Sequence, residues 1–93
     1  MPKFNTTQWR REDRTAEILE KDKYTVIHAK AGEPFHIMAV GPRGVRLILV
    51  ESVADKLDAR QIKMLSAIPV HPICSREVWR WRWKKRTPEI TML

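Results

Sequence analysis

The sequence predicts an α/β fold in a single domain, a mixed sheet flanked by helices, and three patterns support it. Residues 8–21 and 55–66 carry apolar side chains at helical spacing. Two short runs rich in Val, Ile and Leu lie between these segments and are typical of strands. Later in the chain, Trp and basic residues alternate with the period of a strand. A chain of 93 residues suffices for one domain in which helices pack on a sheet.

The chain opens with a predicted helix over residues 8–21 and a predicted strand over residues 24–29. Trp9 and Leu19 fall on one face of the helix. Glu12 follows Trp9 by three residues and therefore lies on the same side. The strand is indicated by its β-branched and aromatic residues. One carboxylate is thus expected on the apolar side of the first helix.

A hairpin is predicted in the middle of the chain, where apolar runs at 35–40 and 45–53 flank Gly-Pro-Arg-Gly at 41–44. Each predicted strand holds one exceptional polar residue, His36 near the start of the first and Glu51 near the end of the second. Because the chain turns at 41–44, both residues lie at the same open end of the sheet. A carboxylate in an apolar strand is seldom buried without a partner or a metal ion.

A second helix is predicted over residues 55–66. Asp58 and Gln61 have the spacing of a capping box, so the firm part of the helix begins there. Pro69 ends the helix. Two prolines within 69–73 limit any strand in that segment to a short strand or an edge strand.

The segment 77–86 alternates Trp with basic residues and is predicted to be a strand. Trp79, Trp81 and Trp83 share one face, which we expect to belong to the core, because a small domain needs that apolar area. Stacking of these rings on nucleic-acid bases is the alternative. The basic residues on the other face either contact phosphates or form a solvated face. Residues 87–93 are expected to add a last turn or an edge strand.

These residues resemble the motif of the PD-(D/E)XK nuclease superfamily, and especially its small archaeal Holliday-junction-resolvase-like members. That family has a Glu in the first helix, an Asp that opens the second strand, and Glu-x-Lys at the end of the third strand. Glu12 stands in the first predicted helix, and the strand that reads Phe-His-Ile-Met-Ala looks like the strand that begins with Asp. Val-Glu-Ser-Val at 50–53 looks like the Glu-x-Lys strand. His36 replaces the Asp, and Val53 replaces the Lys.

The resemblance implies a restriction-endonuclease-like αβββαβ core over about residues 8–83 with a short tail, and a metal-dependent phosphodiesterase site. Its catalytic residues would be Glu12, His36 and Glu51. The metal ligands would be His36 and Glu51, and the cofactor a divalent ion, Mg²⁺ or Mn²⁺. An imidazole ligand shifts the preference away from Mg²⁺.

With two motif residues replaced, we expect an impaired or altered site, and whether the chain is an enzyme stays open. Lys56, Lys30 or Lys63 could supply the missing lysine from a loop or helix, Lys56 being the first candidate. In an inactive site, His36 would be a satisfied histidine at a strand end. Glu51 would then pair with a nearby Lys or Arg.

The basic composition favours an anionic partner, because 18 Lys and Arg against 11 Asp and Glu give a net charge of +7. We expect that partner to be nucleic acid, DNA more than RNA, with a solvated basic surface as the alternative. The candidate nucleic-acid-binding residues are Arg10, Arg11, Arg43, Arg80, Arg82, Lys84, Lys85 and Arg86.

Composition excludes several other classes of site. Cys74 is the only cysteine, so the chain has no internal disulfide and no cysteine-rich zinc site. No apolar run reaches membrane-spanning length, so we expect a cytoplasmic protein without a membrane partner. The sequence predicts a nucleic-acid-binding protein with an impaired or altered nuclease site. The alternatives are an active endonuclease with a migrated lysine, and a non-enzymatic interaction module such as a homodimer.

Overall fold

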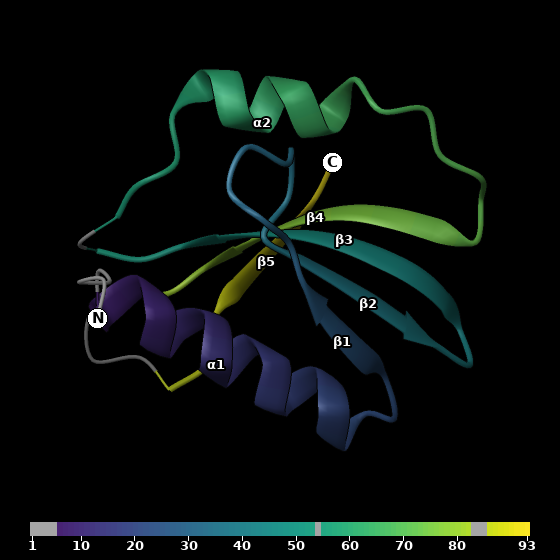
Figure 1. The fold of residues 1–93 in the computed structure, drawn as a ribbon, viewed down its shortest axis with the longest axis horizontal. Helices are drawn as coiled ribbons and strands as arrows, with labels where there is room; N and C mark the ends of the chain where they lie inside the picture. The colour runs from purple at the N-terminus through teal and green to yellow at the C-terminus, as the bar shows by residue number, and fades with distance from the viewer. Residues whose placement is uncertain (1–5, 54, 83–85) are drawn as a thin grey trace.

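Two helices cover opposite faces of a five-stranded mixed sheet (Figure 1). The structure is a computed structural model that describes residues 6–53, 55–82 and 86–93, with side chains from residue 11 onward. The elements are α1 (Thr6–Lys21), β1 (Thr25–His28), β2 (Ile37–Gly41), β3 (Gly44–Glu51), α2 (Ala59–Ser66), β4 (Cys74–Arg80) and β5 (Glu89–Met92). The predicted α/β class with a mixed sheet and flanking helices is therefore confirmed.

The strands lie in the order in which they occur along the chain, β1-β2-β3-β4-β5. The strands β1, β2 and β3 pair antiparallel, and Gly41 pairs with Gly44 at the predicted hairpin turn. The helix α2 connects β3 to β4, which pair parallel. The tail forms β5, an antiparallel edge strand beside β4.

The core has two layers because side chains alternate between the faces of the sheet. On the α1 face, Leu19 packs with Ile48 and Trp79, which are 0% and 2% exposed. On the α2 face, Leu65 packs with Leu49 and its neighbours. Trp81, just beyond β4, also lies in the α1 layer and is 2% exposed, so the prediction that the Trp face belongs to the core is confirmed for Trp79 and Trp81, whereas Trp83 lies outside the described residues.

Several elements are shorter than predicted, and hydrogen bonds explain where they end. β3 ends at Glu51 because Ser52 forms a turn with Asp55: the Asp55 N–H donates to the Ser52 hydroxyl at 3.1 Å. α2 begins after Asp58, whose carboxylate accepts from the Gln61 N–H at 2.8 Å, so the capping box is confirmed. β4 begins at Cys74, before the predicted segment 77–86, and ends at Arg80, so the described residues 81 and 82 lie beyond the strand.

The β2–β3 turn requires glycine at position 44. Gly44 has a φ of 117°, a conformation that side chains rarely adopt. A Cβ at this position would also collide with the carbonyl oxygen of Ile73, which accepts from the Val45 N–H at 2.9 Å. The turn is therefore fixed against the loop that precedes β4.

Candidate nucleic-acid interface

The candidate site lies at the edge of the sheet where the parallel strands β3 and β4 end. Their last residues, Glu51 and Arg80, are opposite each other in the register. Both helices begin at this edge, which is on the left in Figure 1. In open α/β sheets, ligands bind outside the carboxyl ends of the strands. The topology therefore brings the predicted motif carboxylate to the edge where binding sites form.

The Glu51 carboxylate is held on both oxygens. Oε1 lies 3.3 Å from Arg80 Nε, and Oε2 accepts the Leu57 N–H at 3.0 Å. The side chains of Glu51 and Arg80 are 17% and 26% exposed. An inactive site is expected to pair Glu51 with a nearby Lys or Arg, and in the structure that residue is Arg80.

Arg80 links β4 to both neighbouring strands. Besides its contact with Glu51, its Nη1 donates to the Thr91 hydroxyl on β5 at 3.0 Å. The Glu51 carbonyl accepts from the Trp81 N–H at 2.8 Å, which extends the β3–β4 pairing by one residue. The guanidinium is thus fixed by side chains from both neighbouring strands.

His36 enters the sheet through a β-bulge. Its backbone N–H donates to the Ile48 carbonyl at 2.9 Å, although the register places Ile37 opposite Ile48. Two successive residues therefore face one residue of β3, as in a bulge. The His36 Nδ1 accepts the Val50 N–H at 2.9 Å. Because Nδ1 is an acceptor, the neutral imidazole carries its proton on Nε2.

Glu12 lies close enough to His36 for its charge to act on the imidazole, and a second histidine, His28, lies beside Glu12. Burial lowers the pKa of His36, and the carboxylates of Glu12 and Asp55 oppose this shift without cancelling it. The Nδ1 of His28 lies 3.8 Å from a Glu12 carboxylate oxygen. His28 is not among the predicted site residues, although its position at the end of the predicted strand 24–29 is a usable signal.

Glu51 does not belong to this group. It continues the alternation of Leu47 and Leu49, which pack on the α2 face, whereas Glu12 comes from α1. His36 and Glu51 each have their own hydrogen-bond partners, on β3 and on the segment before α2. A shared metal ion remains a prediction from the resemblance.

The residues predicted as metal ligands do not fit a divalent ion as they are held. A metal ligand must offer a lone pair, but His36 uses that of Nδ1 for the Val50 N–H, and its Nε2 carries a proton. Glu51 keeps free lone pairs, but the Arg80 guanidinium, 3.3 Å from Oε1, would repel a divalent ion there. Within the described residues, no three His, Cys, Asp or Glu side chains form a group that could hold a metal ion.

The predicted basic residues divide between two ends of the sheet. Arg82 continues beyond β4 and is 55% exposed, with its Nε 3.0 Å from the Glu89 carboxylate. Arg86 is exposed in the segment that leads to β5. The Arg11 guanidinium lies 5.3 Å from the centre of the Trp81 ring. Arg82 and Arg11 therefore lie at the same edge as Arg80, and Arg86 precedes the strand whose first residue, Glu89, pairs with Arg80.

Arg43 lies elsewhere, in the turn that starts β3, where it pairs with Asp22. β3 has 8 residues, so Arg43 is about 25 Å from the edge at about 3.3 Å per residue. Arg43 is therefore not part of the candidate interface. Three further predicted groups, Lys84, Lys85 and the Arg10 side chain, lie outside the described residues.

A buried ion pair that the sequence patterns did not predict lies on the α1 face. Arg46 donates to both oxygens of Glu77 at 2.8 and 2.7 Å, and Glu77 is 1% exposed. The Ser75 hydroxyl and the Trp79 indole N–H also donate to this carboxylate. Burial raises the pKa of Glu77, but these hydrogen bonds outweigh it and hold the pKa below its ordinary value. The signal was available, because Glu77 shares the period-two face of the Trp residues.

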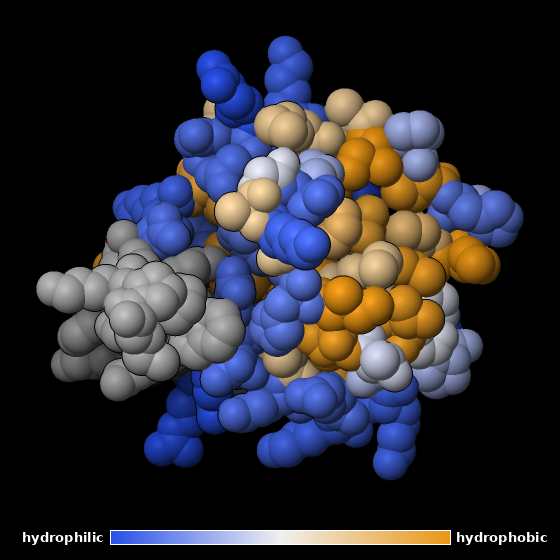
Figure 2. Space-filling model, in the orientation of Figure 1, coloured by the Kyte–Doolittle hydropathy of each residue, from blue (hydrophilic) through white to orange (hydrophobic). Residues whose placement is uncertain are grey.

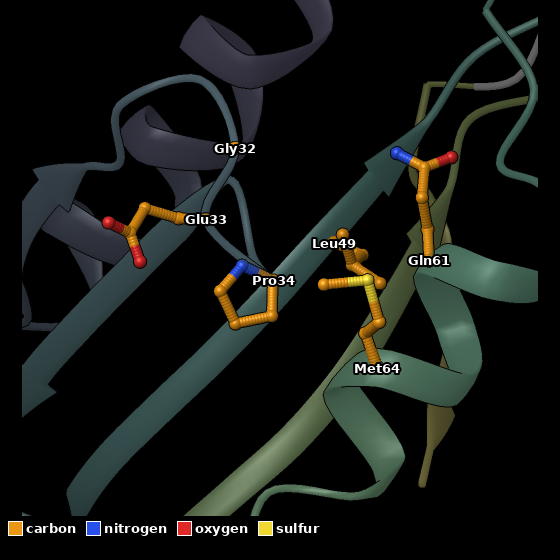
Figure 3. A pocket seen from close by; sticks show the side chains of 6 residues that line it. All are labelled: Gly32, Glu33, Pro34, Leu49, Gln61 and Met64. Carbon is orange, nitrogen blue, oxygen red and sulfur yellow. The ribbon is translucent and has the colours of Figure 1, made fainter.

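A small hollow lies on the α2 face and is not the candidate interface (Figure 3). It has a volume of about 190 Å³ and lies between the loop at 32–34 and α2. Leu49 and Met64 approach each other in it, with Pro34 opposite. This volume is below the range of roughly 300–1,000 Å³ that is typical of small-molecule sites.

The comparisons with known proteins add no family to this description. Neither the protein-family models, the curated proteins nor the solved structures contain a match to the chain. In the part of the chain that the structure describes, neither helix is long and apolar enough to cross a membrane.

Proposed function

We propose that the chain is a cytoplasmic nucleic-acid-binding protein that binds DNA in preference to RNA at the carboxyl edge of β3 and β4. The observation that carries this proposal is the position of Arg80, which is fixed at the end of β4, with Arg82 two residues beyond it and Arg86 in the segment that leads to β5. Positively charged side chains around one edge, on a chain with a net charge of +7, would attract the phosphate backbone of a nucleic acid.

We further propose that the fold is the restriction-endonuclease-like αβββαβ core with one added edge strand. The order of elements from α1 to β4 supports this, as does the α2 crossover between parallel strands. Glu12 lies in the first helix, His36 precedes β2 and Glu51 ends β3, which are the elements that the resemblance assigns. Val53, in the place of the lysine, is 52% exposed beyond the strand end. The site is therefore proposed to be altered, with binding retained.

Binding of a labelled DNA duplex, measured by fluorescence anisotropy over a range of salt concentrations, tests the proposal. We expect affinity to fall steeply with salt, and the slope to decrease by about one for each phosphate contact removed. Replacing Arg82 and Arg86 by Gln should weaken binding and lower the slope. A matched variant with Lys21→Gln and Arg43→Gln removes the same charge at the opposite end of the sheet. Equal effects of the two double variants would contradict an interface at the edge.

The position of Lys56 supports an active endonuclease as a second candidate function. It is exposed and precedes Leu57, whose N–H binds Glu51. Nicking of a supercoiled plasmid with Mg²⁺ or Mn²⁺ tests this candidate. Cleavage by the wild type that is lost in both Glu51→Ala and Lys56→Ala would establish it, whereas absence of cleavage would support the altered site.

Exposed apolar residues favour an interaction module, for example a homodimer, as a third candidate. Figure 2 shows an apolar area between the two helices, over the part of the sheet where β1 and β2 lie. Ile27 and Val40 on these strands are 47% and 42% exposed, and Ile73 is 61% exposed. Sedimentation equilibrium tests this candidate, because a dimer that Ile27→Ser and Val40→Ser dissociate would show that the area is an interface.

A further inference from the structure

The ionic contact at Glu51 leads to a more specific statement, which rests on the proposed function. The resemblance assigns a divalent cation to this carboxylate, yet the cation beside it is Arg80, with Nε 3.3 Å from Oε1. Leu57 holds the second oxygen from its backbone. The register sets Glu51 and Arg80 opposite each other on parallel strands, so the sheet itself fixes this pairing.

One nitrogen of the Arg80 guanidinium, Nη2, is available to bind a ligand. Nε faces Glu51 and Nη1 donates to Thr91, whereas no hydrogen bond among the described residues uses Nη2. The Arg80 side chain is 26% exposed. A guanidinium offers five N–H donors in a rigid plane and binds a phosphate readily. Two of its nitrogens are thus oriented by protein groups, and the third can reach an oxygen anion outside the sheet.

We infer that Arg80 takes the place of the metal ion at Glu51, so that this edge binds a nucleic-acid phosphate directly and without a divalent metal. Glu51 is then a positioning residue that orients the guanidinium. Its negative charge opposes the binding of a phosphate. A guanidinium provides positive charge but holds no activated water, so the phosphodiester is bound and no bond is broken.

The inference predicts that replacing Glu51 changes DNA affinity in the opposite direction from replacing a metal ligand. If a metal bridged Glu51 and the phosphate, Glu51→Gln would weaken binding. If Arg80 binds the phosphate, Glu51→Gln removes a nearby negative charge and should tighten binding by about threefold at low salt. Glu17→Gln is the matched control, because Glu17 is exposed on α1 beside Arg14 and its replacement changes the net charge equally.

The experiment is anisotropy of a labelled DNA duplex with the intact chain, in EDTA and in Mn²⁺. We expect the wild-type affinities in the two buffers to agree within about twofold. Glu51→Gln should bind the duplex more tightly than Glu17→Gln does. Arg80→Gln should bind it about tenfold more weakly than the wild type. Arg80→Lys keeps the positive charge and should bind DNA with an affinity between those of the wild type and Arg80→Gln. This variant also tests the inference if Arg80→Gln does not fold. Wild-type binding that requires Mn²⁺, or weaker binding by Glu51→Gln, would overturn this inference alone. No binding in either buffer would overturn the proposed function as well.

Discussion

Replacing Arg46 by Ala tests whether the buried ion pair with Glu77 stabilises the sheet. The change removes two hydrogen bonds of 2.8 and 2.7 Å from a carboxylate that is 1% exposed. It also removes the guanidinium packed between the Tyr24 and Trp79 rings, at 5.2 and 5.4 Å from their centres. Glu77 would keep only its hydrogen bonds to Ser75 and Trp79.

The expected loss is large for a chain of this size. Leaving one charge of a buried pair without its partner typically costs about 3–5 kcal/mol. A chain of 93 residues has an expected free energy of unfolding of about 5–14 kcal/mol. At an m value of about 2 kcal/mol/M in guanidinium chloride, a decrease of about 4 kcal/mol in the free energy of unfolding lowers the denaturation midpoint by about 2 M.

Guanidinium unfolding at pH 7 and at pH 4 is the assay, with circular dichroism as the signal. The difference between wild type and Arg46→Ala should be smaller at pH 4, because the unpaired Glu77 carboxyl can take up a proton. Arg43→Ala is the control, since Arg43 also contacts Tyr24 but lies at the surface, and its midpoint should not change measurably. A loss below about 1 kcal/mol in Arg46→Ala would refute the reasoning.

Three further predictions concern the hairpin, the bulge and α2. The folded-state pKa of His36 lies below the ordinary value of 6.5, so the unfolded chain binds the proton first. Stability should therefore fall as the pH drops below about 6.5, and the fall should be smaller in His36→Gln, which urea midpoints at pH 7.5 and 5.5 would show. Asp58→Ala should cost about 1 kcal/mol in urea unfolding through the lost cap, and an unchanged midpoint would contradict the capping assignment. Gly44→Ala should lower the free energy of unfolding by at least about 2 kcal/mol, and a neutral result in thermal unfolding would show that the turn adapts.

The order of elements could be predicted from the sequence because each signal was local. Turn residues at 41–44 and the capping spacing of Asp58 and Gln61 depend only on neighbours in the chain. The Trp alternation identified a buried face in the same way. The ends of the strands were less predictable, because Ser52 ends β3 through a turn with Asp55 that the apolar pattern does not show.

The partners of the predicted site residues depended on pairings across the sheet, which the sequence does not give. That Glu51 meets Arg80 follows from the parallel register of β3 and β4. That His36 accepts a hydrogen bond from Val50 follows from a bulge, which has no clear sequence signal here. Arg43 was grouped with the other basic residues by charge alone, although the strand β3 separates it from them.

The most direct measurement of the central claim is an NMR titration of the intact protein with a DNA duplex in EDTA. The account predicts that the Nε–H signal of Arg80 and the backbone amides of Leu57 and Trp81 shift as DNA is added. The amides of the turn at 41–44, at the other end of β3, should remain in place. Shifts confined to that turn, or no shift at the edge without added metal, would contradict the claim that Arg80 binds a phosphate at the ends of β3 and β4.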